Sequence, residues 1–233
     1  MESTNAATEP QAPAPAPSGL SLRGLWEVFF KPADFFAEIK DHPRLIVPWL
    51  MVAVATAATI YLMDDFIIKM QMDAMRDNPN MNPSMMPTAD QMRPWLYIGV
   101  LFWAVLPIVT AAIALFWGNF VFGGAAKFSQ LLSVMLYGLW LYMIGGVIQA
   151  FMALAKGSMK ASLSLAVLVP DRPIDDPLYT LLSKLSVFHV WEIIVVGIGL
   201  SVLYKFPRNK GYLIAVLSVG LVALIHVASA AIF

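Results

Sequence analysis

Five long runs of apolar residues dominate the pattern of the chain. They cover residues 45–63, 95–117, 128–155, 185–204 and 212–233. A helix needs about 20 predominantly apolar residues to cross a hydrocarbon layer about 30 Å thick. The pattern therefore predicts five membrane-spanning helices. The last two are joined by only a short polar stretch, so we expect them to be adjacent and antiparallel.

Two segments of different character precede the first run. Residues 1–19 are rich in alanine and proline and have no apolar periodicity, which is typical of a disordered tail. Residues 20–42 place apolar side chains on one face at helical spacing and charged side chains on the other. This pattern predicts amphipathic helices in the membrane interface, divided at Pro32. The apolar face includes Leu22, Leu25, Trp26, Phe29, Phe35, Phe36 and Ile39.

Composition supports a membrane protein and excludes several other classes. Hydrophobic residues make up 59% of the chain and charged residues 13%, against about 45–50% and about 25% in soluble domains. The chain has no cysteine, which excludes disulfides and thiolate zinc sites. Fifteen basic residues balance fifteen acidic ones, so no basic excess indicates nucleic acid as a partner. The predicted fold class is an all-α, five-helix transmembrane bundle that spans residues 43–233.

The distribution of basic residues predicts an orientation. Lys205, Arg208 and Lys210 crowd the short stretch between the last two runs, and Arg44 directly precedes the first. Basic residues in short loops favour the cytoplasmic side of a membrane. We therefore expect the N-terminus in the cytoplasm and the C-terminus outside.

Three stretches together resemble a known family. Residues 30–36, with paired aromatics after a proline, are followed by His42-Pro43; residues 123–137 begin with Gly-Gly; and residues 188–200 contain Trp191 and a Gly-Ile-Gly sequence. In order and spacing they resemble the Ypt-interacting protein (Yip) family in its bacterial branch, over about residues 22–230. The resemblance implies five spans, a cytosolic N-terminus, a place in the inner membrane and no established catalytic residues.

The function expected from this resemblance is non-enzymatic. In eukaryotic relatives it implies Rab-type GTPase partners, but the short Ala/Pro-rich tail has no recognisable trafficking motif. We expect a scaffold, adaptor or accessory subunit without a cofactor. Its partners are the lipid bilayer and another membrane protein or a second copy of the chain. An enzyme acting on lipid would need a nucleophile–base pair, which the sequence does not present.

A group of polar residues within the apolar runs offers the best candidate site. Glu192 lies roughly 10 Å into the fourth run, where a carboxylate costs about 2–3 kcal/mol unless it is neutral or paired. His189 precedes it by three residues and shares its helix face. His226 and Gln149 are expected at similar depth on the fifth and third runs. The cluster indicates either a small permease or proton-coupled carrier, or a polar pairing that fixes helix register.

Methionines and paired acids give weaker signals for a metal. Eight of the 14 methionines fall between residues 63 and 92, and thioethers suit Cu(I). Packing of a helical cap explains the same residues, so no metal site is predicted. Asp64-Asp65 and Asp175-Asp176 are expected to be solvated acids at the outer surface.

Overall fold

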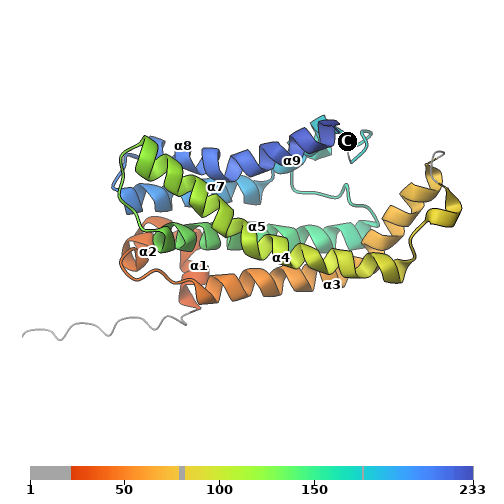
Figure 1. Ribbon diagram of the computed structural model, residues 1–233, viewed down its shortest axis with the longest axis horizontal. Coiled ribbons are helices and arrows are strands. Elements are labelled where there is room, and N and C mark those ends of the chain that lie inside the picture. Colours follow the sequence, from red (N-terminus) through yellow and green to blue (C-terminus); the bar gives the residue numbers. More distant parts are fainter. Residues whose placement is uncertain (1–21, 79–81, 175, 233) are drawn as a thin grey trace, which may run out of the picture.

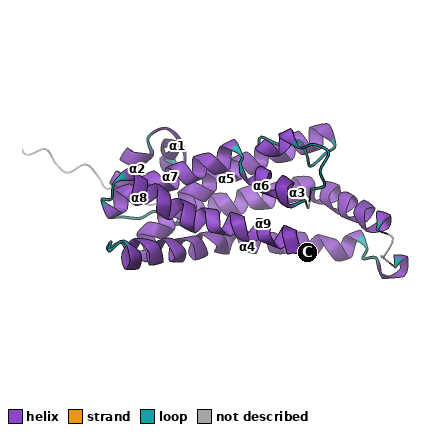
Figure 2. Ribbon diagram, turned by 90° about the horizontal axis from the view of Figure 1, so that it is seen from above, coloured by secondary structure: helices purple, strands orange, loops and turns teal. Residues whose placement is uncertain are grey.

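The computed structural model describes residues 22–78, 82–174 and 176–232, and within these ranges every regular element is a helix (Figures 1 and 2). The tail predicted at residues 1–19 lies outside them. The α-helices are α1 (Arg23–Phe30), α2 (Pro32–Ile39), α3 (Ile46–Asp77), α4 (Ala89–Leu115), α5 (Phe128–Lys156), α6 (Pro177–Lys184), α7 (Val187–Tyr204), α8 (Arg208–Ala215) and α9 (Leu221–Ile232). Shorter helical turns are η1 (Pro83–Met85), η2 (Phe116–Val121), η3 (Leu165–Leu168) and η4 (Val216–Gly220).

Four of the helices are long and apolar enough to cross a membrane. They are α3, α4 continued by η2, α5 and α7. The fifth predicted run forms a continuous helical segment in which the π-turn η4 joins α8 to α9. The structure thus supports a multi-pass, all-α membrane protein with four candidate spans by length and composition.

The first two spans are longer than the apolar runs predicted. α3 has 32 residues, about 48 Å of helix, and continues past the acids expected to end it. It can do so because Arg93 on α4 contacts Asp64 and Asp65, each at 2.7 Å. α4 begins at Ala89 instead of residue 95, where the Thr88–Gln91 capping box satisfies its first amides. Figure 1 shows these ends of α3 and α4 extending beyond the rest of the bundle.

The helices alternate in direction, so the bundle has two distinct ends (Figure 1). One end holds α1, α2, the α4–α5 connection and the α7–α8 turn. The other end holds the α3–α4 connection, α6 and the C-terminal end of α9.

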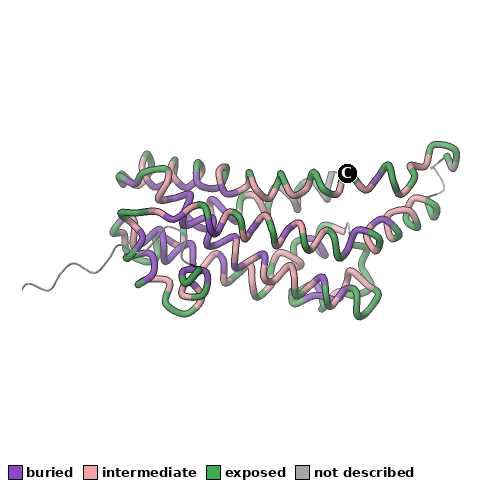
Figure 3. The backbone as a smooth tube through the Cα atoms, turned by 90° about the horizontal axis from the view of Figure 1, so that it is seen from below, coloured by how far each residue is buried: buried purple, intermediate pink, exposed green. Residues whose placement is uncertain are grey.

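Burial is concentrated toward the end that holds α1 and α2 (Figure 3). There Tyr137 on α5 packs edge-on against Phe35 at 4.6 Å between ring centroids. α5 is the central helix: 61% of its most apolar window is buried, against 22% for α4 with η2. The exposed apolar surface of α4 therefore faces the bilayer.

α2 lies within the bundle and not only at its surface. Phe35 and Phe36 are 2% and 1% exposed. Two side chains of α5 also donate hydrogen bonds to backbone carbonyls of the N-terminal segment. Gln130 donates to the carbonyl of Lys40 at 2.6 Å, and the Trp140 indole donates to the carbonyl of Leu25 at 3.1 Å. The apolar face of α2 therefore meets protein and not lipid, whereas Trp26 and Phe30 on α1 are exposed.

Small residues allow α7 and α8 to pack backbone against backbone. A Cβ atom added at Gly211 would overlap the carbonyl oxygen of Gly197 and the hydroxyl of Ser201. Such close approach is a common feature of helix pairs in membranes. This antiparallel hairpin of α7 and α8 positions α9 beside the cavity described below.

Candidate functional site

A cavity of about 490 Å³ lies between α4, α5, α7 and α9, with α6 at one end. Its volume falls within the range of about 300–1,000 Å³ that is typical of small-molecule sites. Most of the lining is apolar. The lining residues are Phe102, Trp103, Val105, Leu106, Pro107, Val109, Thr110, Met135, Leu139, Tyr142, Lys184, His189, Glu192, Val219, Val222 and Ala223.

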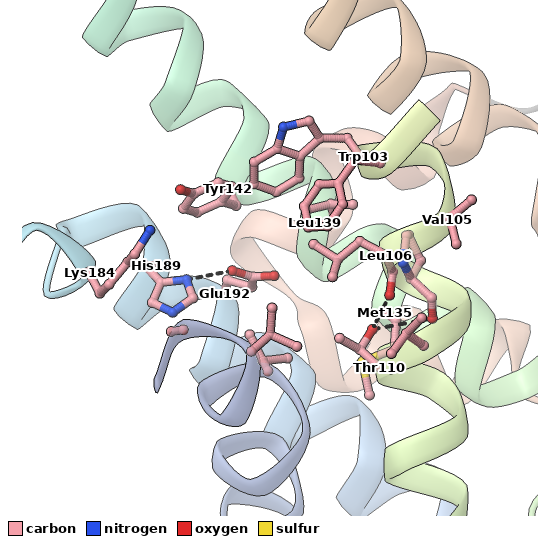
Figure 4. Close-up of a pocket in the computed structure, with 16 residues that line it drawn as sticks. Trp103, Val105, Leu106, Thr110, Met135, Leu139, Tyr142, Lys184, His189 and Glu192 are labelled. Atoms are coloured by element: carbon pink, nitrogen blue, oxygen red, sulfur yellow. Dashed lines mark hydrogen bonds and ion pairs between the residues drawn. The ribbon is translucent and has the colours of Figure 1, made fainter. Parts of the chain in front are cut away.

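The polar end of the cavity contains a bonded pair on α7. His189 Nδ1 lies 2.9 Å from the Oε2 atom of Glu192, and the Glu192 side chain is nearly inaccessible to solvent. Ser186 caps α7 by accepting a hydrogen bond from the His189 amide at 3.1 Å. Figure 4 shows both side chains pointing from α7 toward α4 and α5. The buried Glu192 carboxylate thus has its hydrogen-bond partner on its own helix.

Aromatic side chains form one wall beside this pair. Tyr142 on α5 packs edge-on against His189 at 5.4 Å, and Trp103 on α4 stacks on Tyr142 at 5.5 Å between centroids. The row links α4, α5 and α7 and packs against the imidazole of His189 (Figure 4). The Thr110 hydroxyl at the far end donates to the backbone carbonyls of Leu106 and Pro107, each at 3.2 Å, so it does not offer a base-activated nucleophile.

Lys184 adds a positive charge at the polar end. It is the last residue of α6, whose first amides bind the Asp176 carboxylate at 2.9 and 3.0 Å. No described residue forms an ion pair with Lys184. Removal from water disfavours its charged form and lowers the pKa of the ammonium group. An anion at this end would restore the charged form.

The side of the cavity formed by α4 faces the membrane. Phe102, Val105 and Val109 line the cavity and are also 58%, 52% and 45% exposed. These residues lie on a candidate membrane span. The opening beside α4 therefore meets the hydrocarbon chains of the bilayer.

The structure brings together two of the four residues proposed from the sequence. His189 and Glu192 are bonded, whereas Gln149 is partly buried and is not one of the residues that line the cavity. α5 runs past the start of α7, so that Gly145 faces Phe188 and Gly138 faces Glu192. Gln149 consequently lies nearer the membrane surface than Glu192. His226 belongs to α9, but its side chain lies outside the described part of the structure.

Three cavity residues were not singled out from the sequence. Trp103 and Tyr142 are aromatic residues within apolar runs, like many others in the chain. Sequence spacing cannot predict that two side chains on different helices will stack. Lys184 did carry a signal, because it stands directly before the fourth apolar run. Its place beside His189 became evident only from the turn that connects α6 to α7.

Asp64 is a second buried acid, and its environment corrects the expectation of a solvated residue. Its side chain is 8% exposed and accepts from Arg93 Nη1 at 2.7 Å, whereas Asp65 stays at the surface. Asp176 caps α6 and pairs with Arg172 at 2.8 Å; Asp175 lies outside the described residues. Within the described residues, no group of three or more His, Asp or Glu side chains is placed to hold a metal ion.

Comparison with known proteins gives one informative match. The model of the Yip1 domain family matches residues 26–230, which is most of the chain. Searches of curated proteins and of solved structures found no match. The match covers the spans, the α1–α2 segment and the helices around the cavity. The chain therefore belongs to the Yip1 domain family of membrane proteins.

Proposed function

We propose that the chain is a non-enzymatic, five-span scaffold or adaptor of the Yip type, in the bacterial branch of the family and in the cytoplasmic (inner) membrane. The observation that carries this proposal is the fixed, outward aromatic face of α1. Trp26 and Phe30 are 68% and 73% exposed, although α1 itself is tied to α5 by the Trp140 bond. A rigid apolar face beside the bundle is suited to binding another membrane protein or a second copy.

The fifth span in this proposal is the segment from α8 to α9. It runs from Arg208 to Ile232, about 37 Å of helix, which is enough to cross the hydrocarbon layer. The π-turn η4 interrupts the regular helix only locally. With five spans the two termini lie on opposite sides.

The proposed orientation places α1 and α2 on the cytoplasmic side. The same end of the bundle holds the α7–α8 turn with Lys205, Arg208 and Lys210 (Figure 1). Short basic loops are retained in the cytoplasm. The Lys210 ammonium also lies over the rings of Phe122 and Phe206 at 5.8 and 5.4 Å, which supports an interfacial position for this end.

A test of the adaptor role is mild co-purification from the native membrane, followed by identification of proteins by mass spectrometry. The double variant Trp26→Ala/Phe30→Ala removes the outer face of α1 without touching the core. Phe120→Ala is the matched control, because Phe120 is 76% exposed at the same end. We expect a stoichiometric partner that the double variant loses and the control keeps. Retention by both variants would contradict the role of α1.

A small permease or proton-coupled carrier is the second candidate, favoured by the buried His189–Glu192 pair. Buried ionisable groups in membrane helices often mark proton or substrate paths. Glu192→Gln keeps the shape of the side chain and removes its proton exchange. Unchanged proton flux and activity of this variant in proteoliposomes would exclude the carrier.

A further inference from the structure

The cavity between α4, α5, α7 and α9 is apolar over most of its lining and carries charged groups at one end, which matches the shape of an amphiphilic molecule. Its apolar part is formed by aliphatic and aromatic side chains from several helices, and its ionisable groups Lys184, His189 and Glu192 gather at the α6 end (Figure 4). The opening beside α4 is lined by exposed Phe102, Val105 and Val109. A molecule that enters there comes from the hydrocarbon of the bilayer, so its buried part is an apolar chain.

The depth of the polar end fits a lipid headgroup. Lys184 ends α6, immediately before α7 begins at Val187, so it lies at the membrane boundary. Glu192 lies five residues farther along α7 than Val187, about 8 Å deeper. A lipid with its headgroup at Lys184 would therefore keep its normal depth while its chain passes beside α7.

The charges at this end select an anion. His189 and Glu192 are bonded to each other at 2.9 Å, and Lys184 has no ion-pair partner among the described residues. An ammonium group that is partly removed from water gains most from a charge-assisted hydrogen bond to a phosphate or carboxylate oxygen. The Glu192 carboxylate is bonded to His189 and forms no ion pair with the Lys184 ammonium group.

We propose that this cavity binds one acyl chain of an anionic phospholipid, with the lipid phosphate at Lys184. The role goes beyond the adaptor function and does not depend on it. α1 and its aromatic face lie at the opposite end of the bundle (Figure 1).

Native mass spectrometry of the full-length protein tests the site. The protein is stripped of lipid in detergent and titrated with phosphatidylglycerol or phosphatidylcholine of identical chains. We expect one phosphatidylglycerol to bind about tenfold more tightly than phosphatidylcholine, about 1.4 kcal/mol, because both lipids carry the phosphate but the choline ammonium of phosphatidylcholine is repelled by Lys184. Lys184→Gln should remove this preference. Ala223→Phe, which fills the cavity from α9, should abolish binding of both lipids.

Two matched controls separate the site from the rest of the surface. Lys156→Gln removes an exposed lysine at the same end, and Ala228→Phe adds a ring to the exposed face of α9. Both should bind lipid like the unmodified protein. If Ala223→Phe or Lys184→Gln binds phosphatidylglycerol as its control does, the proposal is wrong. Should Ala223→Phe fail to fold by circular dichroism, Lys184→Gln decides alone.

Excess inorganic phosphate distinguishes a lipid from a free anion. The acyl chain contributes most of the affinity in our account, so phosphate should not displace phosphatidylglycerol. Displacement by phosphate would overturn the lipid proposal and identify a site for free anions.

Discussion

The two ends of the bundle are built from similar residues but are packed differently. At the α1–α2 end, Phe35, Phe36 and Tyr137 fill the space between α5 and α7, and all three are nearly inaccessible to solvent. At the α6 end, Trp103 and Tyr142 stand at the edge of a 490 Å³ cavity. Both ends use aromatic rings from several helices. The difference indicates that the first end secures the fold, whereas the second keeps room for a ligand.

The largest contrast should come from equivalent phenylalanine truncations. Phe36→Ala removes a ring from the close-packed end and should cost about 3–5 kcal/mol of unfolding free energy. Phe102→Ala removes a half-exposed ring at the cavity opening and should cost less than about 1 kcal/mol. Reversible unfolding in mixed detergent measures both. Equal losses would mean that the two ends do not differ in packing.

Two glycine-to-alanine changes should have opposite signs. Gly211→Ala forces α8 away from the Gly197 backbone and should cost about 1–3 kcal/mol. Gly146→Ala meets no atom within 4 Å and should gain about 0.5–1 kcal/mol from helix propensity. The same unfolding assay compares them. A loss at Gly146 would show that this face of α5 has a neighbour.

The close-packed end contains two buried hydroxyls without a hydrogen-bond partner among the described residues, those of Tyr137 and Tyr204. Tyr137→Phe should therefore raise the unfolding free energy by about 1 kcal/mol. Tyr142→Phe, at the cavity, should change it by less than about 0.5 kcal/mol. Destabilisation by Tyr137→Phe would reveal a partner for that hydroxyl.

The smallest expected effect is a pH response of α6. The amide of Tyr179, together with Arg172 and the Leu178 amide, lowers the pKa of Asp176. The pKa of Asp176 in the folded protein lies below its unfolded value of about 3.9. The carboxylate therefore stabilises α6 fully above the unfolded pKa, and this stabilisation is lost as the pH falls through the folded pKa. Hydrogen exchange of α6, corrected for intrinsic rates, should be constant from pH 5 to 8 and faster at pH 3. Asp176→Ala should remove this dependence.

Hydropathy was sufficient to predict the helical class, the order of the helical segments and the four long apolar helices now identified as candidate spans. It missed the continuation of α3 past Asp64, because the compensating Arg93 is on another helix. It also placed Phe35 and Phe36 at the interface, since an amphipathic pattern does not reveal whether its apolar face meets lipid or protein. The His189–Glu192 pair was predictable from its spacing of three residues. Gln149 does not line the cavity, because α5 continues past the start of α7 and Gly145, not Gln149, lies beside Phe188; run lengths alone do not reveal such an offset between two helices.

The central claim is that the hollow end holds a lipid chain, and quenching of Trp103 by brominated lipids tests it directly. The Trp103 contribution is the difference in emission between the unmodified protein and Trp103→Phe, both in phosphatidylcholine nanodiscs. We predict that a small fraction of phosphatidylglycerol with brominated chains quenches this contribution more strongly than equally brominated phosphatidylcholine. Ala223→Phe should remove the excess. Equal quenching by the two lipids, unaffected by Ala223→Phe, would contradict the account.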